Sequence, residues 1–326
     1  MVFESLKVHI KAELQALNFG RREPPKLTKN TNQKDFGIMR DLNYSLKQLC
    51  HAERQGSYAT KAARFSALQL CADQLYDLGF KLPAAKSIKP KHVRALVDNW
   101  KAGGLSIGTI KNRLSHIRFW ADKVDRKSIL ESNEAYGIGQ RESFKGNKAQ
   151  RLDLGKLATI ESERVKMSLR LQAAFGLRRE ESIKFRPGIA DQGDKIALQC
   201  SWTKGGKARE IPITTDKQRE LLEEAKALVG DSSLIPEGMS YYEHVQVYKH
   251  SIAKAKLGRL HGLRHNYAQW RYKQLSGMDA PAVSGVKYAD LSDHEKLMDT
   301  LAREIVSREL GHSRLDVTNV YLGGRK

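Results

Sequence analysis

The chain has 326 residues, enough for two domains, and its 40% hydrophobic and 29% charged residues exclude an intrinsically disordered protein. The formal net charge is +20, to which residues 1–150 contribute 27 Lys and Arg against 14 Asp and Glu, and residues 151–326 contribute 30 against 23. A surplus of this size in both halves indicates a polyanionic partner, nucleic acid above all; a soluble basic protein without such a partner is the alternative.

The cysteines and the apolar runs indicate the compartment. Cys50, Cys71 and Cys200 form an odd, scattered set, which does not fit a disulfide framework or a structural zinc site and indicates reducing conditions. The N-terminus lacks the continuous apolar core of a signal peptide, and no apolar run approaches the length that spans a bilayer. We therefore expect a cytoplasmic, nucleoid-associated protein without a membrane partner.

Residues 1–55 are expected to form an N-terminal extension. Within it, residues 19–36 are basic and lack periodicity, so they are interpreted as a loop. Residues 56–125 are expected to form a small domain of three amphipathic helices, the first of which ends near Gly79. The apolar positions of the three helices are Phe65, Leu68, Cys71, Leu75 and Leu78; then Val93, Leu96, Val97 and Trp100; then Ile110, Leu114, Ile117, Ala121 and Val124.

The third of these predicted helices also has a basic face, which can neutralise DNA phosphates; a solvated charged surface is the alternative. Its candidate DNA-binding residues are Lys111, Arg113, Arg118 and Lys123. Residues 126–150 contain three glycines and little apolar pattern, so they are interpreted as an interdomain linker. Two domains joined in this way can close around a rod-shaped ligand.

The C-terminal half, residues 151–326, concentrates cationic residues in four short stretches. In LQAAFGLRREESIKF a predicted helix is followed by two arginines, of which Arg178 can be aimed at a phosphate; an Arg–Glu surface pair is the alternative. In KIALQCSWTKGGKAREIPI two alternating runs, the first reaching Trp202, predict a β-hairpin with a turn at Gly205-Gly206. Lys204 stands near its tip; a solvated turn lysine is the alternative.

The remaining two stretches carry histidines. In LHGLRHNYAQWRY, His261 and His265 stand at i and i+4, close to Arg264. That spacing can bind zinc, but no third ligand is in sight, so no metal site is predicted and His265 is expected to be structural. The closing stretch LGHSRLDVTNVYLGGRK places His312 after a glycine and Tyr321 nine residues later.

These residues fit one kind of chemistry when they occur in the order Arg, Lys, His-x-x-Arg, His and a late Tyr. Two guanidiniums can hold the non-bridging oxygens of a phosphodiester, a phenol can attack the phosphorus, and a Lys or His can protonate the leaving oxygen. The order resembles that of the tyrosine recombinases, the family of phage integrases and chromosome-dimer resolvases. The matching segments are GLRREE, TKGGKAREIPI, HGLRH and LGHS followed by Tyr321.

The resemblance implies both the site and the fold. Its catalytic residues are Arg178, Lys204, His261, Arg264, His312 and Tyr321. Glu181 supports the first arginine, and Lys207, beside the hairpin tip, joins the DNA-binding residues. The implied fold is mainly α with a small antiparallel β-sheet. It consists of a SAM-like helical core-binding domain and a catalytic domain over residues 151–326, which together form a clamp around DNA.

The implied reaction is a pair of transesterifications through a 3′-phosphotyrosine link, without cofactor, metal ion or ATP. Tyr321 attacks the scissile phosphate, Lys204 protonates the 5′-oxygen and His261 takes the phenolic proton. The implied partners are double-stranded DNA with paired recombination sites, a homotetramer assembled on that DNA, and accessory DNA-bending proteins. The expected biological role is that of an integrase of a mobile genetic element, bacterial or phage-encoded.

The sequence departs from the family pattern in two ways. Arg264 and His312 are 48 positions apart, and residues 276–300 between them look like an insertion with helical content at its end. The insertion either contacts DNA or a neighbouring protomer, or forms a passive surface loop. Only five residues follow Tyr321, so residues 1–55 are a candidate for contacts between protomers or for extra DNA contacts.

Three other functions fit parts of the pattern. A type IB topoisomerase shares this active-site chemistry but relaxes DNA of any sequence and needs no partner duplex. A catalytically inactive DNA-binding or architectural protein on the same fold would form no covalent adduct with DNA. A metal-dependent nuclease would use His261 and His265 and would lose its activity in a chelator.

Overall fold

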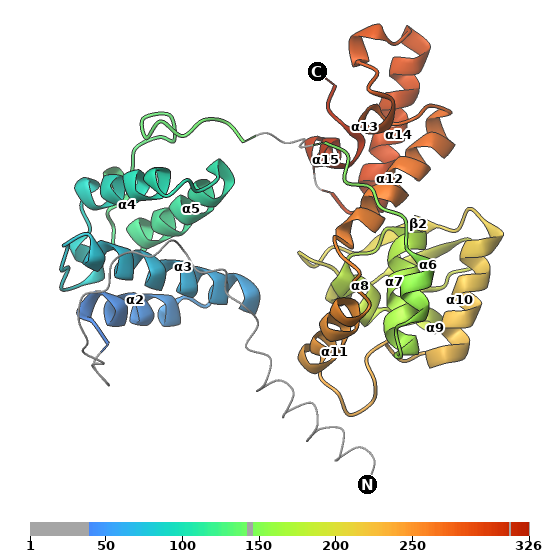
Figure 1. Cartoon of the computed structure of the whole chain (residues 1–326), viewed down its shortest axis with the longest axis horizontal. Helices are drawn as coiled ribbons and strands as arrows, with labels where there is room; N and C mark the ends of the chain where they lie inside the picture. The colour runs from blue at the N-terminus through green and yellow to red at the C-terminus, as the bar shows by residue number, and fades with distance from the viewer. Residues whose placement is uncertain (1–38, 142–145, 313, 326) are drawn as a thin grey trace. The chain divides into compact units, whose positions relative to one another are not determined.

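The computed structural model describes residues 39–141, 146–312 and 314–325. The chain divides into two compact units, Met1–Gln140 and Arg141–Lys326. Figure 1 draws both units. Among the described residues, the first unit has one cluster of buried hydrophobic residues and the second unit has two. Most of the expected N-terminal extension, including the loop predicted over residues 19–36, lies outside the described residues.

From residue 39 to residue 140, the first unit is a bundle of helices. The bounds are α2 (Asp41–Ala52), α3 (Tyr58–Asp77), α4 (Pro90–Ala102) and α5 (Ile107–Lys123), with short 3-10 turns η1 (Ala85–Ser87) and η2 (Lys127–Ile129). Helices α3 and α5 begin at serine caps, because the hydroxyl oxygens of Ser57 and Ser106 each accept a hydrogen bond from the backbone N–H three residues later. A proline opens α4, where a missing N–H has no effect on the helix.

The apolar stripes predicted for α4 and α5 form much of the core of this unit. Their fully buried residues are Val93, Leu96, Val97, Trp100, Ile110, Leu114, Ile117 and Ala121. The indole N–H of Trp120, also buried, donates to the carbonyl of Ala85 at 2.9 Å, so that no polar atom of that ring is left unpaired. The inward prediction for Leu78 is wrong. It is 39% exposed, because α3 ends at Asp77 and the chain turns at Gly79 with φ +87°.

The first unit extends beyond the expected residues 56–125 at both ends. Helix α2 lies in the segment expected to precede this domain, yet Leu42 and Leu46 are buried in the same core. Beyond α5, residues expected to belong to the linker, Ile129, Tyr136 and Ile138, are buried in that core as well. Leu42, Leu46 and Leu49 of α2 stand at helical spacing, so the boundary before this domain was set too late, whereas the segment after α5 contributes only a few buried side chains and carries no periodic signal.

The second unit is mainly helical with one small sheet. Its helices are α6 (Leu154–Ala158), α7 (Glu163–Phe175), α8 (Arg179–Lys184), α9 (Pro187–Ala190), α10 (Asp216–Val229), α11 (Tyr241–Lys254), α12 (His261–Ser276), α13 (Pro281–Ser284), α14 (Asp293–Glu309) and α15 (Asn319–Leu322). Its strands are β1 (Lys195–Leu198) and β2 (Arg209–Pro212), and 3-10 turns lie at η3 (Cys200–Trp202), η4 (Tyr288–Asp290) and η5 (Leu315–Val317).

The two strands pair antiparallel, with Lys195 opposite Pro212 and Ile196 opposite Ile211. This register confirms the predicted hairpin and, with the helices around it, the predicted fold class of mainly helical structure with a small antiparallel sheet. The first strand is shorter than expected. Cys200 and Trp202 lie in the turn η3, where the Trp202 ring packs edge-on against Phe185 at 6.2 Å between centroids.

Helix α12 lies against α7, α14 and α15 in this unit, as Figure 1 shows. Tyr267 and Tyr272 of α12 are buried together with Phe175 of α7 and Val306 of α14. Three of the predicted motif segments lie on or directly beside these helices. Their packing therefore determines which of the motif side chains meet.

The expected insertion, residues 276–300, contains α13, η4 and the start of α14. Asp299 accepts a hydrogen bond from Nε of Arg325 at 2.9 Å, and Arg303, one turn later, donates to the carbonyl of Gly323 at 3.0 Å. Residues at and just beyond the end of this segment thus hold the tail after Tyr321 on its own unit. In the described part of the chain, we find no helix with the length and apolar character that crossing a membrane requires.

Candidate active site

Tyr321 lies on the short helix α15, among side chains from α12 and from the segment after α14. The residue is only 7% exposed. Its ring is flanked by the rings of His265 and His312, whose centroids lie 4.4 Å and 5.1 Å from its own. Its phenolic oxygen lies 3.1 Å from Nε2 of His261. The fold therefore brings a phenol within hydrogen-bond distance of an imidazole that is 60 positions away in the sequence.

His261, the first residue of α12, is exposed, in contrast to its neighbours on that helix. Partial desolvation and the positive charges of Arg264 and Arg178 lower the pKa of His261 below its usual value. The ring is therefore neutral at pH 7, and a neutral ring nitrogen can accept a proton from the phenol of Tyr321. This is the distance and the protonation state that a general base requires.

Arg264 is almost fully buried close to the tyrosine ring, with its guanidinium carbon 5.9 Å from the ring centroid. Its terminal nitrogens donate to the carbonyls of Gly176 and Leu310. Its Nε–H has no acceptor among the described residues. Burial and the nearby Arg178 lower the pKa of Arg264 to about 10, which leaves it charged at neutral pH. A buried cation with a free N–H beside a phenol is suited to a phosphate oxygen.

Gly176 explains why a glycine precedes the first arginine motif. It ends α7 in the left-handed conformation with φ +61°, and a Cβ at this position would lie 2.5 Å from Cδ1 of Tyr267. A residue without a side chain is needed for α7 to end this close to α12. The same close approach presents the Gly176 carbonyl to Arg264.

Arg178 stands at the start of α8 and meets the acidic residue three positions later. Its Nη1 donates to Oε1 of Glu181 at 2.7 Å and its Nη2 to the carbonyl of Leu310 at 3.3 Å, while its backbone N–H donates to Oε2 of Glu181 at 2.6 Å. Burial alone would raise the pKa of Glu181, but hydrogen bonds from Arg209 and the charge of Arg264 lower it to about 2. Glu181 is therefore an ionised anchor for a set of guanidiniums.

His312 follows the glycine that ends α14. Its Nδ1 lies 3.0 Å from Oγ1 of the buried Thr318. Desolvation, together with Arg264 and Arg178, lowers the pKa of His312 to about 3. The ring is therefore neutral at pH 7. If the Thr318 hydroxyl donates to Nδ1, the proton of the ring stands on Nε2, where it can be donated to an anion.

Two residues that the sequence analysis did not single out also contact this group. Arg209, on β2, donates to both carboxylate oxygens of Glu181 at 2.9 and 2.6 Å. Gln269, on α12, donates to the backbone carbonyl of Tyr321 at 2.9 Å. Gln269 stands eight positions after His261, hence on the same helix face, and this spacing could have indicated it. His265, predicted to be structural, packs directly on the tyrosine ring.

Lys204 and Lys207 are not brought into this group. Both lie exposed in the turn between β1 and β2, where Gly205 and Gly206 have φ of +87° and +65°. The structure records no hydrogen bond from either ammonium group to a described residue. Lys204 is thus placed on an open turn next to a strand that does reach the site, since β2 carries Arg209.

The predicted DNA-binding residues of the first unit are mostly engaged inside it. Arg118 donates to Oδ1 of Asn133 at 2.9 Å, and Lys123 pairs with Glu53 at 2.5 Å. The Arg113 guanidinium lies 5.3 Å from the Trp100 ring centroid. Lys111 is half-buried. Three of the four therefore carry an intramolecular contact that a DNA phosphate would have to share or replace.

A hollow of about 460 Å³ opens beside His261 and Arg264. Its lining includes the cations Arg179, Lys249 and Arg259. Arg259 has φ +52°, a conformation uncommon for a residue with a side chain and often found at functional sites. In residues 39–141, 146–312 and 314–325, no three His, Cys, Asp or Glu side chains are grouped so that they could hold a metal ion.

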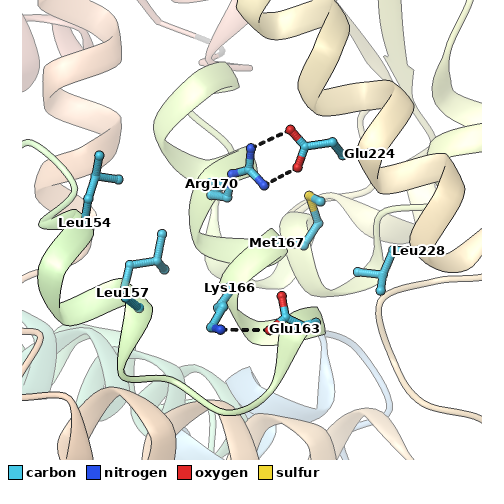
Figure 2. Close-up of a pocket in the computed structure, with 9 residues that line it drawn as sticks. Leu154, Leu157, Glu163, Lys166, Met167, Arg170, Glu224 and Leu228 are labelled. Carbon is cyan, nitrogen blue, oxygen red and sulfur yellow. Dashed lines mark hydrogen bonds and ion pairs between the residues drawn. The ribbon is translucent and has the colours of Figure 1, made fainter.

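A second hollow, of about 490 Å³, lies among α6, α7 and α10. Figure 2 shows the two ion pairs at its walls, one joining Arg170 to Glu224 with a hydrogen bond of 2.8 Å and one joining Lys166 to Glu163. None of the predicted site residues is among the described residues that line it. The charged groups there are already paired with one another.

Two family models match consecutive segments of the chain. The model described as phage integrase, N-terminal, matches residues 39–129, and the model described as integrase matches residues 140–270. The chain belongs to the phage integrase family of tyrosine recombinases. This is an enzyme family of site-specific recombinases, and the membership confirms the resemblance seen in the motifs of this recombinase.

Several solved structures share the fold of this recombinase. A lambda integrase dimer bound to a COC′ core site gives a TM-score of 0.57 at 14% identity, covering 87% of this chain and 96% of that chain. The Tn1549 transposon integrase in complex with circular intermediate DNA gives 0.51 at 13% identity, covering 88% and 97%. XerH bound to a palindromic difH substrate gives 0.53 at 17%, covering 86% and 80%. A search of curated proteins found no match.

Proposed function

We propose that the chain cuts and rejoins DNA at a specific site through a 3′-phosphotyrosine intermediate, as the integrase of a mobile genetic element. The observation that carries the proposal is the 3.1 Å separation of Nε2 of His261 from the phenolic oxygen of Tyr321. The relatives named above are bound to a core site, to circular intermediate DNA and to a difH site. The net charge of +20 suits the same class of ligand.

In the first step the oxygen of Tyr321 attacks the scissile phosphorus, so that a new O–P bond forms and the bond to the 5′-oxygen breaks. A phenol has a pKa of about 10, so at neutral pH its proton must be taken up. His261 takes it, since its ring is neutral and in contact with the hydroxyl. Lys204 donates a proton to the leaving 5′-oxygen, which its exposed turn allows once DNA lies in the site.

The transferred phosphate is bound by Arg178, Arg264 and His312. The unpartnered Nε–H of Arg264 supports this assignment, because a buried N–H without an acceptor destabilises the free protein by about 1–3 kcal/mol and a phosphate oxygen would satisfy it. In the second step the 5′-hydroxyl of a partner strand attacks the phosphotyrosine and releases Tyr321. The ester keeps the bond energy between the two steps, so neither ATP nor a metal ion enters the scheme.

The proposed partners are double-stranded DNA with paired sites and further copies of this chain. Rejoining to a new strand requires two duplexes side by side, and hence a homotetramer with one site on each strand. The related structures include a lambda integrase dimer on a core site and a tetramer on a Holliday junction. The cation-lined hollow beside His261 supports the course of one strand past the site. We also propose that accessory DNA-bending proteins take part and that the protein associates with the nucleoid.

The test begins with selection of bound duplexes from a random library by the Tyr321→Phe variant. The enriched duplex is then given a nick close to the cleavage point, so that the short 5′ fragment leaves and any covalent adduct is trapped. We expect a denaturant-resistant protein–DNA band with the wild type and none with the variant. Absence of the band from the wild type on every enriched duplex sinks the proposal. Relaxation of plasmids that lack the enriched site would instead indicate a topoisomerase.

A further inference from the structure

Arg209 is a buried arginine on β2 to which the proposed reaction gives no role. Its side chain is 6% exposed. Nη1 and Nη2 donate to Oε1 and Oε2 of Glu181 at 2.9 and 2.6 Å, and Nε donates to the backbone carbonyl of Glu309 at 2.8 Å. All three nitrogens of the guanidinium are thus occupied by protein acceptors. With 6% of its side chain exposed, against 24% for Arg178, Arg209 is not placed to bind a phosphate in this arrangement.

The carboxylate that Arg209 holds is the one that holds Arg178. Oε1 of Glu181 accepts hydrogen bonds from Nη1 of Arg178 at 2.7 Å and from Nη1 of Arg209 at 2.9 Å. Glu181 is fully buried, so no water competes for these oxygens. A guanidinium that binds both oxygens of a carboxylate fixes the plane of that carboxylate. The orientation of Arg178 then follows from the orientation that Arg209 imposes on Glu181.

Arg209 also lies against the turn that leads to His312. Besides its hydrogen bond to the carbonyl of Glu309, its Cδ would lie 2.9 Å from a Cβ placed on Gly311. Gly311 has φ +63° and ends α14 directly before His312. The carbonyl between them, that of Leu310, accepts hydrogen bonds from Arg178 and Arg264. The turn at 309–311 thus packs against Arg209 and accepts hydrogen bonds from Arg178, Arg209 and Arg264.

We propose that Arg209 is a positioning residue, which sets Arg178 through Glu181 and His312 through the turn at 309–311. It does not touch the substrate. Because β2 also follows the turn that carries Lys204, Arg209 links the lysine turn to the phosphate-binding arginines. This inference rests on the proposed function, since it concerns the same site.

The test uses the nicked duplex and the rate at which the trapped adduct forms. Arg209→Lys keeps the charge but lacks the planar fork that donates side by side to both oxygens of Glu181, and we expect it to slow adduct formation about tenfold. Arg209→Ala should slow it about 100-fold, as loss of preorganised donors commonly does. DNA affinity should stay within threefold for both variants, because the Arg209 side chain is only 6% exposed and donates to protein acceptors. The matched control is Arg219→Ala, since Arg219 also pairs with a carboxylate, Asp191, but away from Tyr321.

A pH profile separates positioning from support of the fold. Glu181 faces three cations, Arg178, Arg209 and Arg264, and without Arg209 its carboxylate should take up a proton more readily. The ratio of variant to wild-type rate should therefore fall as the pH is lowered from 7.5 to 5.5. In the double variant Arg209→Lys with Glu181→Gln, the same ratio should not change with pH. A residue that only supports the fold would lower the rate by the same factor at every pH.

A spectroscopic readout distinguishes failure of this inference from failure of the proposed function. In the full-length protein labelled with ¹⁵N-arginine, the Nε–H signal of Arg178 should shift or broaden in Arg209→Lys and stay unchanged in Arg219→Lys. If the wild type forms no adduct, the proposed function fails while this comparison still tests Arg209. Wild-type rates in Arg209→Lys would overturn the inference. So would an unchanged Arg178 signal, or slowing of Arg209→Ala and Arg219→Ala in proportion to their loss of Tm.

Discussion

Nε2 of Gln269 donates one hydrogen bond to the backbone carbonyl of Tyr321 and a second to Oδ1 of Asn147, both 2.9 Å long. Helix α15 has only four residues, so its own backbone hydrogen bonds do little to fix it. The side-chain amide of Gln269, on the long helix α12, holds the backbone of α15 at Tyr321. Asn147 belongs to the short stretch that opens the described part of the second unit, so one side chain joins that stretch to the residue that reacts.

The first prediction concerns this amide. Gln269→Leu keeps the volume of the side chain but removes both hydrogen bonds. We expect the trapped adduct to form roughly tenfold more slowly, because a small displacement of the reacting group is costly in rate. Asn147→Ala is the control, since it removes the bond between Gln269 and Asn147 and keeps the bond to Tyr321. It should change the rate less than twofold. Equal rates for Gln269→Leu and wild type would contradict the role of Gln269.

The second prediction concerns the proton of Tyr321. His261→Ala should slow adduct formation by about 10²–10⁴, the usual contribution of a general base. The pKa of His261 is lowered from its usual value, so in the wild type the rate should fall when the pH drops below 6.5 and the ring becomes protonated. Above that pH the ring is neutral and the rate should level off. This acid limb should be missing from the variant when single-turnover rates are measured from pH 5 to 8.

The third prediction separates the two arginines. Arg178 is 24% exposed and Arg264 only 1% exposed. Arg178→Ala and Arg264→Ala should each abolish measurable recombination and leave DNA affinity largely intact. Each change removes donors to the phosphate, which should lower the rate of adduct formation by about 10²–10³. Their effects on folding should differ. Arg264→Ala leaves the buried carbonyls of Gly176 and Leu310 without this donor and should lower the free energy of unfolding by about 3–5 kcal/mol in urea titrations, against about 1 kcal/mol for Arg178→Ala.

The fourth prediction concerns Lys204 as the acid. Lys204→Ala should slow cleavage of the nicked duplex while Tm stays within about 1 °C of wild type, because the side chain is exposed and makes no hydrogen bond to a described residue. A duplex with sulfur in place of the 5′-bridging oxygen has a leaving group that needs no proton. On that duplex the variant should recover most of the wild-type rate. Equal slowing on both duplexes would show that Lys204 acts in another way.

The fifth prediction concerns stability against pH. Burial lowers the pKa of His244 and of His265 to about 4, and desolvation beside Arg264 lowers that of His312 to about 3. In the unfolded chain these rings titrate near 6.5, so between the two values the unfolded state binds more protons. The free energy of unfolding should therefore be at its full value above pH 6.5 and decrease as the pH falls toward 4.

The size of this effect can be isolated at His244, which is fully buried. It should contribute a slope of at most about 1.4 kcal/mol per pH unit in this window. Urea titrations at pH 7 and pH 5 should give a smaller difference in His244→Gln than in the wild type, whatever the absolute stability of the variant. An identical difference in the two proteins would contradict a neutral, buried His244.

The amino-acid sequence by itself determined the residue types of the site and most of the local structure. The periodic stripes of α4 and α5, the hairpin and the order of Arg178, His261, Arg264, His312 and Tyr321 all follow from spacing along the chain. Such signals are local, since a helix repeats every 3.6 residues and a strand every two. Where a segment contributes only a few anchoring residues, as Ile129, Tyr136 and Ile138 do, the local signal is weak and the predicted boundary was displaced.

Only the tertiary structure decided which of these side chains meet and what holds them. The contact of His261 with Tyr321, the two bonds of Arg209 to Glu181 and the bond of Gln269 to Tyr321 join residues 60, 28 and 52 positions apart. Contacts over such separations depend on how α12 packs against α15 and how β2 lies beside α8, and no periodicity within one segment encodes that packing. The neutral state of His312 has the same origin, because its burial and the charges around it come from other elements.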